Sequence, residues 1–327
     1  PFLLGSFLPR PHFADITHSL PGPFATMRRS LSLLSLQLVG QATASAAYRC
    51  VFIHGVGVAE TAPADTNDTM GYWGGLERIS EYTPYCASRH FLHENTVKRG
   101  WDDTGLHRSA CDLAVGSGAD TAIRDTVVIT HSMGNLIFAE ALRQGTCSLE
   151  STSKWVSIEA PWQGSKAVPW VSELCSNHTS SRLLRWLAKE LHYCDPDLPG
   201  QVYRGYETLH PDFPGLQKLI PVAEMNVHRA LCGSSAYGLQ SSYSAALEAL
   251  ALEVKYGEHN DGMVAVSSFT LPGASYEGHY SAPFYLAHIN HADGTCRVGN
   301  GVIKKVDRLP CDWLSSAVQN VTETVFV

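Results

Sequence analysis

Short runs of apolar residues alternate along the chain with segments whose apolar residues recur every three or four positions. The runs predict buried strands at 48–53, 126–129 and 154–159, because they are short, rich in β-branched or aromatic residues and too brief to form a helix. Two later strands are expected at 229–232 and 283–289, and helices are expected at 72–82, 101–115, 135–143, 182–192, 242–256 and 311–325. Strands that alternate with helices favour an α/β fold with a mostly parallel central sheet flanked by helices.

The segment 175–215 interrupts this alternation. It contains Pro196, Pro199, Pro211 and Pro214, which break regular structure. We expect a lid-like insertion here, although an ordinary surface excursion explains the composition equally well.

The start of the chain has the pattern of an export signal. A basic group at 27–29 is followed by an apolar run at 31–40 and by small residues at 41–46. The run is too short to span a membrane and is not periodic, which favours a signal peptide over 27–46 rather than a buried amphipathic helix. Residues 1–26 are then expected to lie outside the working protein.

The remaining residues, 47–327, are expected to form one domain, and they contain all nine cysteines. The cysteines are Cys50, Cys86, Cys111, Cys147, Cys175, Cys194, Cys232, Cys296 and Cys311. No two of them form a C-x-x-C pair, which argues against zinc and thioredoxin-type redox sites. In an exported protein they indicate several disulfides and one odd thiol. The close-spaced candidates are Cys86–Cys111, Cys175–Cys194 and Cys296–Cys311, although sequence alone does not determine the connectivity.

Three N-x-[ST] acceptors, at Asn67, Asn177 and Asn320, agree with export. We therefore expect a secreted or secretory-pathway protein that carries disulfides and glycans.

Charge and composition exclude several kinds of partner. Twenty-four basic residues against 31 acidic ones give a net charge of −7, which disfavours binding to nucleic acid or an anionic membrane by bulk charge. No apolar run reaches the roughly 18 residues of a transmembrane span. Hydrophobic residues make up 44% of the chain, enough for a large core. The oligomeric state stays open.

The strongest chemical signal is Ser132, in Thr130-His131-Ser132-Met133-Gly134 between the strand at 126–129 and the helix that follows. A sharp strand–turn–helix places a serine at the carboxyl edge of a sheet, and a small Gly134 lets the helix approach. The alternative is a serine that only caps the helix. Thr130 departs from the usual G-x-S-x-G pattern.

A serine needs a base to take its proton and an acid to orient that base, in the chain order Ser, Asp/Glu, His. Asp261 in Asn-Asp-Gly and His291 in Asn-His-Ala-Asp follow Ser132 in that order. Taken alone, Asp261 would be a plain turn residue, and His288 competes with His291 as the base. His54 and His131 are expected to position loops.

The oxyanion of an acyl-transfer intermediate needs backbone N–H donors. We expect one from Met133, directly after the nucleophile, and one from Val56 in the His-Gly-Val-Gly loop after the first strand.

These motifs together resemble the α/β-hydrolase lipases, most closely the true bacterial triacylglycerol lipases. The segments that carry the resemblance are His54-Gly55, Tyr72-Trp73-Gly74-Gly75, Thr130–Gly134, Asn260–Val264 and Asn290–Asp293. The resemblance implies the α/β-hydrolase fold, a triad of Ser132, Asp261 and His291, and Val56 and Met133 as oxyanion donors. It favours His291 over His288.

The resemblance also bears on metal binding and on one loop. Bacterial relatives hold a structural calcium near the histidine, and Asp293 matches one ligand, but a second carboxylate is not identified. No cofactor is therefore expected. The loop 160–165 resembles one that lies beside the acyl site in eukaryotic phospholipase and acyltransferase relatives, and it also fits a Pro/Gly turn with a core tryptophan. Asn135 stands where a glycine often follows the elbow.

The sequence thus predicts a serine ester hydrolase, lipase-like, that cleaves lipid carboxylic esters through an acyl-enzyme. A phospholipase, a polyester depolymerase or a thioesterase would carry the same motifs. A hydrolase fold kept as a non-catalytic binding protein is the alternative from another class.

Overall fold

The computed structural model describes most of the chain. The described residues are 48–61, 69–117, 120–176, 182–198 and 200–319. All of them belong to one compact unit, Ala44–Val327. The expected signal peptide, the segment before it and the three glycan acceptors lie outside the described residues.

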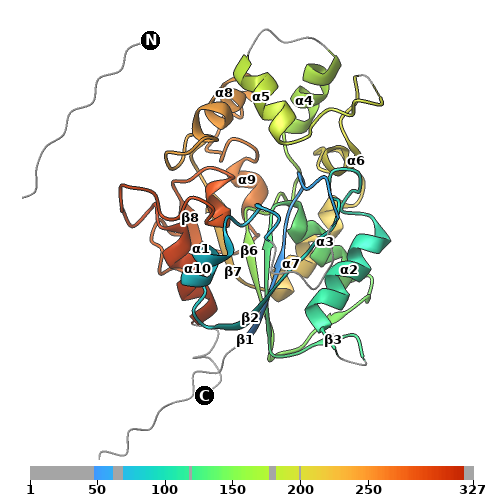
Figure 1. The fold of residues 1–327 in the computed structure, drawn as a ribbon, viewed down its shortest axis with the longest axis vertical. Helices are drawn as coiled ribbons and strands as arrows, with labels where there is room; N and C mark the ends of the chain where they lie inside the picture. Colours follow the sequence, from blue (N-terminus) through green and yellow to red (C-terminus); the bar gives the residue numbers. More distant parts are fainter. Residues whose placement is uncertain (1–47, 62–68, 118–119, 177–181, 199, 320–327) are drawn as a thin grey trace, which may run out of the picture. The chain divides into compact units, whose positions relative to one another are not determined.

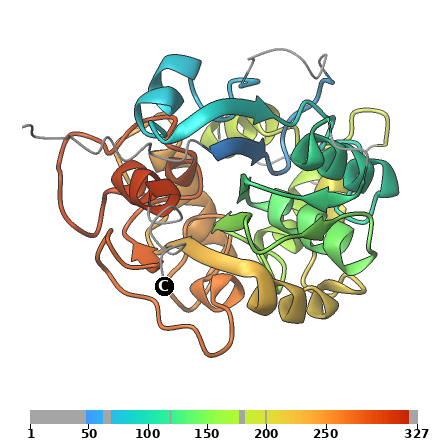
Figure 2. The same cartoon turned by 90° about the horizontal axis from the view of Figure 1, so that it is seen from below.

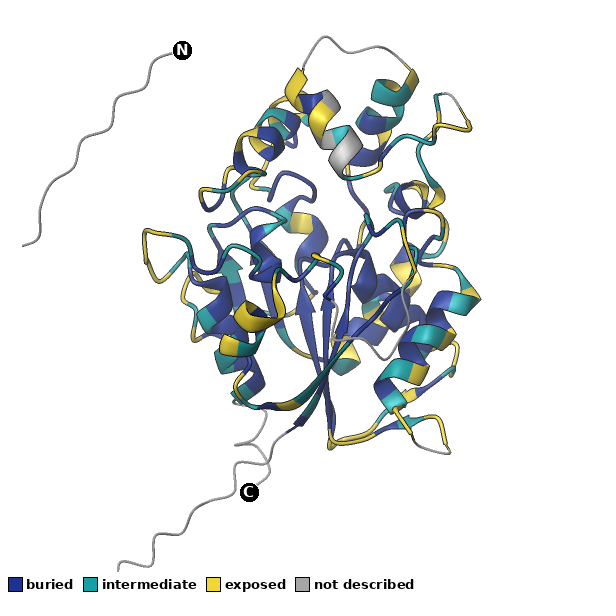
Figure 3. Cartoon of the chain, viewed as in Figure 1, coloured by how far each residue is buried: buried dark blue, intermediate teal, exposed yellow. Residues whose placement is uncertain are grey.

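Six parallel strands form the central sheet, in the order β2-β1-β4-β6-β7-β8 (Figure 1). Their bounds are β1 Tyr48–Ile53, β2 Cys86–Phe91, β4 Thr126–His131, β6 Lys154–Ile158, β7 Val227–Gly233 and β8 Phe284–Ala287. β3 (Ala122–Ile123) and β5 (Ser148–Leu149) form a small separate pair. Most of the central sheet is buried, as expected of a parallel sheet covered on both faces (Figure 3).

The helices follow the strands in sequence. Their bounds are α1 Leu76–Glu81, α2 Thr104–Val115, α3 Met133–Arg143, α4 Ala167–Ser176, α5 Arg182–Glu190, α6 Arg204–Glu207, α7 Ile220–Asn226, α8 Ser244–Val254, α9 Val266–Phe269 and α10 Pro310–Gln319, with 3₁₀ turns η1 Leu216–Lys218 and η2 Asp293–Thr295. Among the described residues, no helix is long and apolar enough to cross a membrane.

Helices cover both faces of the sheet, and each face has its own core (Figure 2). Side chains alternate along a strand, so in β1 Val51 and Ile53 pack with α2, α3 and α7, whereas Cys50 and Phe52 pack with α1 and α10. The sequence prediction of a mostly parallel α/β sheet flanked by helices is confirmed.

A third apolar cluster lies above the carboxyl ends of the strands. It joins α4, α5 and α8 through residues such as Val171, Leu184 and Leu247, and it includes Tyr193 and Tyr206. The expected insertion supplies much of this cluster.

Several elements differ from the prediction: β2, α4 and α7 were not anticipated, and α1 was expected to begin too early. β2 was not anticipated, because its central residues Ser88, Arg89 and His90 are polar and the strand lies at the sheet edge. The helix expected from residue 72 begins only at Leu76, since Gly74 adopts a φ of 73° that a helix does not allow.

Four disulfides connect described cysteines. Cys175–Cys194 and Cys296–Cys311 agree with the sequence expectation, but Cys86 pairs with Cys50 and Cys111 with Cys147. The Cys86–Cys111 guess was wrong because β1 and β2 are neighbours in the sheet, which outweighs proximity in sequence. Cys232 is the odd thiol, and it is buried.

Candidate active site

Ser132 occupies a sharp turn between a strand and a helix. β4 ends at His131 and α3 begins at Met133, while Ser132 itself has φ 54° and ψ −129°. A β-carbon on Gly134 would lie 2.5 Å from the carbonyl oxygen of Ile53, so only glycine lets α3 approach β1 this closely. The chain has the α/β-hydrolase fold. This fold is characterised by a mostly parallel sheet that carries a serine elbow at its carboxyl edge.

The two departures from the usual elbow of an α/β-hydrolase bond to each other. The Thr130 hydroxyl donates to Oδ1 of Asn135, and the indole N–H of Trp155 donates to Thr130 Oγ1 at 2.7 Å. The Asn135 amide donates to the carbonyl oxygens of Ser132, at 3.0 Å, and Ile158, at 2.9 Å. The threonine and the asparagine therefore brace the elbow.

The structure brings Ser132, His291 and Asp261 together. Ser132 Oγ lies 2.9 Å from Nε2 of His291, and His291 Nδ1 lies 2.5 Å from Oδ2 of Asp261. The other carboxylate oxygen of Asp261 accepts the N–H groups of Met263 at 2.8 Å and Val264 at 2.7 Å. Asp261 is completely buried. The acid is thus held on both oxygens, and the imidazole bridges it to the serine.

His288, the competing base, lies elsewhere. Its backbone N–H donates to the carbonyl oxygen of Asp307 at 2.6 Å, beside the outer edge of β8. Burial lowers the pKa of His288. His291, by contrast, is in hydrogen-bond reach of the serine, so geometry favours the residue that the sequence favours.

The first loop crosses directly over the elbow. A β-carbon on Gly55 would lie 2.5 Å from Cβ of Ser132. This close approach brings the next residue, Val56, to the pocket beside Ser132, and its N–H has no hydrogen-bond partner among the described residues. Met133 is the first residue of α3, where a backbone N–H has no partner within the helix. Among the described residues neither N–H group has a hydrogen-bond partner, so both are available as donors beside the serine.

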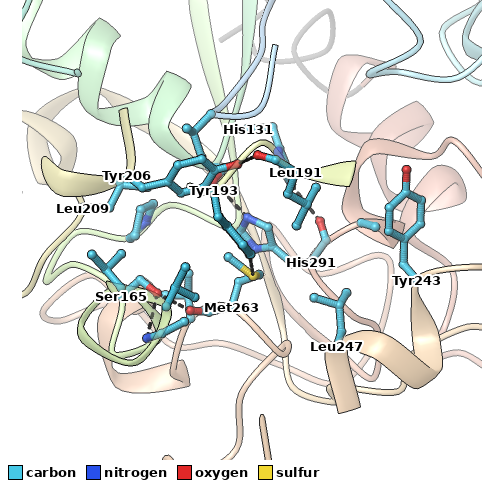
Figure 4. A pocket seen from close by; sticks show the side chains of 18 of the residues that line it. His131, Ser165, Leu191, Tyr193, Tyr206, Leu209, Tyr243, Leu247, Met263 and His291 are labelled. Carbon is cyan, nitrogen blue, oxygen red and sulfur yellow. Dashed lines mark hydrogen bonds between the residues drawn. The ribbon is translucent and has the colours of Figure 1, made fainter. Parts of the chain in front are cut away.

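An apolar pocket opens onto Ser132 and His291. Figure 4 shows His291 among the side chains that line it. Its lining includes Tyr193 and Tyr206, whose rings meet edge to face at 4.5 Å, and Leu191 and Leu209. These four residues come from the 175–215 insertion, which therefore forms one wall. Val168, Val171, Tyr243, Leu247, Met263 and Val264 also line the pocket.

The loop 160–165 combines a core tryptophan with residues that line the pocket. Trp162 is buried against Trp155, with the two ring centroids 6.0 Å apart, so it is a core residue. Pro161 and Ser165 line the pocket beside Ser132.

A second group of polar side chains lies behind His291 and was not anticipated from the sequence. His131, Glu159 and His291 have nitrogen and oxygen atoms that all lie within 4.8 Å of one another. They are linked by hydrogen bonds: His131 Nε2 lies 2.8 Å from Glu159 Oε2 and 3.0 Å from the backbone oxygen of His291. His131 thus positions the histidine loop, as expected. No local pattern marks Glu159, which follows an ordinary strand.

The residues around Asp293 do not fit a calcium ion. Its Oδ2 accepts backbone N–H groups from Leu239 at 2.7 Å and Asn290 at 3.0 Å, and N–H groups aimed at a site disfavour a cation there. Burial raises the pKa of Asp293 to about 7. The expectation that the protein needs no cofactor is not tested by these contacts.

The chain matches no protein-family model and no curated protein. Among solved structures it is similar to the mature lipase BlEst2 of Bacillus licheniformis, with 15% identity, 86% of this chain and 91% of that chain covered, and a TM-score of 0.46. It is also similar to lipase 1 of Pelosinus fermentans, with 14% identity, 85% of this chain and 99% of that chain covered, and a TM-score of 0.45. The lipase of Staphylococcus hyicus is a third similar structure, with 11% identity, 86% of this chain and 97% of that chain covered, and a TM-score of 0.46.

Proposed function

We propose that this protein is a serine ester hydrolase that cleaves lipid-like carboxylic esters through an acyl-enzyme. The observation that carries the proposal is the hydrogen-bonded series Ser132–His291–Asp261 at the mouth of an apolar pocket. A serine, a base and a buried acid in this geometry activate the hydroxyl for attack on a carbonyl.

The acylation step uses the three side chains in turn. Ser132 Oγ attacks the ester carbonyl carbon while His291 Nε2 takes the hydroxyl proton. The imidazolium so formed is oriented and stabilised by the Asp261 carboxylate through Nδ1. The tetrahedral oxyanion faces the N–H groups of Val56 and Met133. The C–O bond to the alcohol then breaks, and the leaving oxygen takes the proton from His291.

The deacylation step repeats the chemistry with water. His291 removes a proton from water as it attacks the acyl carbon, and the proton then passes to Ser132 as the acid leaves. Because the wall next to Ser132 is apolar, we propose that the pocket holds the acyl chain of the substrate.

Phospholipase, polyester depolymerase and thioesterase activities use the same steps. An acyl-chain series of esters separates them from a lipase: activity that rises sharply above the solubility limit of a long-chain ester supports a lipid substrate. A preference for short soluble esters or for thioesters contradicts it. A pocket that binds a fatty acid without any turnover would support the non-catalytic alternative.

We further propose that the protein works outside the reducing cytosol. The four disulfides among the described residues support this, because such bonds persist in oxidising compartments.

The central test is covalent labelling with a fluorophosphonate, which reacts with activated serines. We expect the wild type to be labelled at Ser132, and Ser132→Ala to lose both the label and ester hydrolysis. Ser153→Ala is the matched control, because Ser153 is equally buried but bonds to the backbone of Ile123, away from the pocket. Labelling that survives in Ser132→Ala contradicts the proposal.

A further inference from the structure

Glu159 is a fully buried carboxylate beside the triad that the proposed mechanism does not use. It follows β6, whose Ile158 pairs with His131 of β4, so it stands next to Ser132 at the sheet edge. Its φ is 49°, a left-handed conformation that a glutamate adopts only where its surroundings impose it. The fold therefore holds this side chain in place at a conformational cost.

The backbone around Glu159 leaves room for the carboxylate. A β-carbon on Gly233, at the end of β7, would lie 2.8 Å from Oε1, and one on Gly294, in η2, would lie 2.4 Å from Oε2. Two glycines thus enclose the carboxylate. Oε1 has no hydrogen-bond partner among the described residues.

A chain of hydrogen bonds determines which proton faces Glu159. Burial lowers the pKa of His131 well below its usual value, so the ring is neutral and carries one N–H. Nε2 lies 3.0 Å from the backbone oxygen of His291, which can only accept, so the proton sits on Nε2 and Nδ1 accepts from the Tyr72 hydroxyl, 2.6 Å away. That N–H points at Glu159 Oε2, 2.8 Å away.

Glu159 also lies close to the reacting histidine. Its Oε2 is 3.8 Å from Nδ1 of His291, the same nitrogen that bonds to Asp261. Burial and the neighbouring carboxylates of Asp261 and Asp293 raise the pKa of Glu159, while Arg297 lowers it. A negative charge at Glu159 is therefore favoured most when a positive charge forms next to it, as happens when His291 takes the serine proton.

We propose that Glu159 is a second carboxylate for His291: a positioning residue that, held by His131, stabilises the imidazolium and takes over part of the orienting role when Asp261 is lost. This inference rests on the proposed function, because it assigns a role within the same site. It differs from the usual triad in giving one imidazole nitrogen two acidic neighbours.

The first test follows the ring of His291 by NMR as a function of pH, with its signals assigned through His291→Gln. Because Gln keeps the shape of Glu159 but cannot ionise when His291 gains a proton, Glu159→Gln is expected to lower the titration midpoint of His291 by about one pH unit. Tyr72→Phe removes the hydroxyl next to Nδ1 of His131, so the ring proton is less firmly held on Nε2. We expect this variant to lower the titration midpoint of His291 by less than Glu159→Gln does. This second variant keeps the inference testable if the first does not fold.

The second test compares labelling rates in two backgrounds. Glu159→Gln is expected to slow fluorophosphonate labelling about tenfold more in an Asp261→Ala background than in the wild type. Equal factors in the two backgrounds would mean that Glu159 does not replace Asp261. Glu140→Gln, which removes a carboxylate bonded to Arg143 on α3, is the control that leaves both readouts unchanged.

A folded Glu159→Gln protein with an unmoved His291 midpoint would overturn the inference. The NMR readout requires no ester turnover, so the two proposals fail separately. A wild type that is never labelled contradicts the hydrolase proposal, whereas a labelled wild type with an unmoved midpoint contradicts only the role of Glu159.

Discussion

At the scale of single residues, the elbow shows how two unusual side chains compensate for each other. Thr130 places a hydroxyl where a glycine is usual, and Asn135 places an amide where another glycine often follows. Alone, Asn135 would leave its buried Oδ1 without a hydrogen-bond donor, and the Thr130 hydroxyl supplies that donor. The same threonine oxygen accepts the indole N–H of Trp155 in the core. The hydroxyl thus adds a further connection between the elbow and the sheet, beside the Asn135 amide that donates to Ile158.

Replacing Thr130 with valine should remove both connections at once. The shape is kept, but Asn135 and Trp155 lose a buried partner, so we expect the free energy of unfolding to fall by about 1–3 kcal/mol. Urea unfolding measures this, and the labelling rate should fall with it. Thr130→Ser is expected to retain most of the stability. Thr126→Val is the matched control in the same strand, because its hydroxyl makes a single local bond to Arg124. An equal loss in Thr126→Val would argue against a special role of Thr130.

At the scale of elements, the 175–215 insertion forms part of the pocket rather than a remote excursion. Cys175 near the end of α4 is linked to Cys194 beyond α5, and Leu191 and Tyr193, just before Cys194, line the pocket. Trp186 on α5 lies 6.0 Å, ring to ring, from Tyr243. This disulfide consequently holds a pocket wall, whereas Cys111–Cys147 joins α2 to the segment after α3, and neither of these two cysteines lines the pocket.

Removal of the two disulfides should therefore separate stability from specificity. A Cys175→Ser, Cys194→Ser protein and a Cys111→Ser, Cys147→Ser protein are each expected to lose about 2–4 kcal/mol of unfolding free energy. Only the first is expected to lose activity on long-chain esters in preference to short ones, since only it loosens the pocket wall. An acyl-chain series on both proteins checks this. An unchanged chain-length profile in the first protein would show that the wall does not need the bond.

At the scale of the whole molecule, the parallel sheet assembles the site from distant segments. Ser132 follows β4, Asp261 follows α8 and His291 follows β8, and all three meet because parallel strands end at the same edge. The same assembly buries His54 and His131 near the middle of the fold. Burial lowers the pKa of His54 to about 4, and that of His131 well below its usual value. Folding therefore excludes protons that the unfolded chain binds.

The fold should accordingly weaken on mild acidification. A histidine whose pKa is lowered in the folded state stabilises the protein fully above its unfolded pKa of about 6.5, and this stability is lost as the pH falls towards 4. For His54 the loss amounts to about 3 kcal/mol. His54→Asn is expected to make the unfolding free energy less dependent on pH between 8 and 5. His279→Asn, at an exposed site, should follow the wild type, and identical pH curves for all three proteins would contradict the account.

The sequence by itself determined the elements with strong periodicity and the three residues nominated as nucleophile, acid and base. Ser132, Asp261 and His291 stand in short local patterns, a strand–serine–helix turn and two turns near later strands, that are visible without a structure. Both boundaries of β1 agree with the prediction, and β4 begins where expected but extends two residues further, to His131.

Only the tertiary structure decided which residues surround that triad. Glu159 follows an unremarkable strand, and it becomes a neighbour of His291 because β6 lies beside β4 and η2 folds over it. Cys50 pairs with Cys86 because β1 lies beside β2, an edge strand too polar to be recognised in advance. The physical reason is the same in both cases: local patterns depend on adjacent residues, whereas burial, charge pairing and disulfide geometry depend on which strands become neighbours in the sheet.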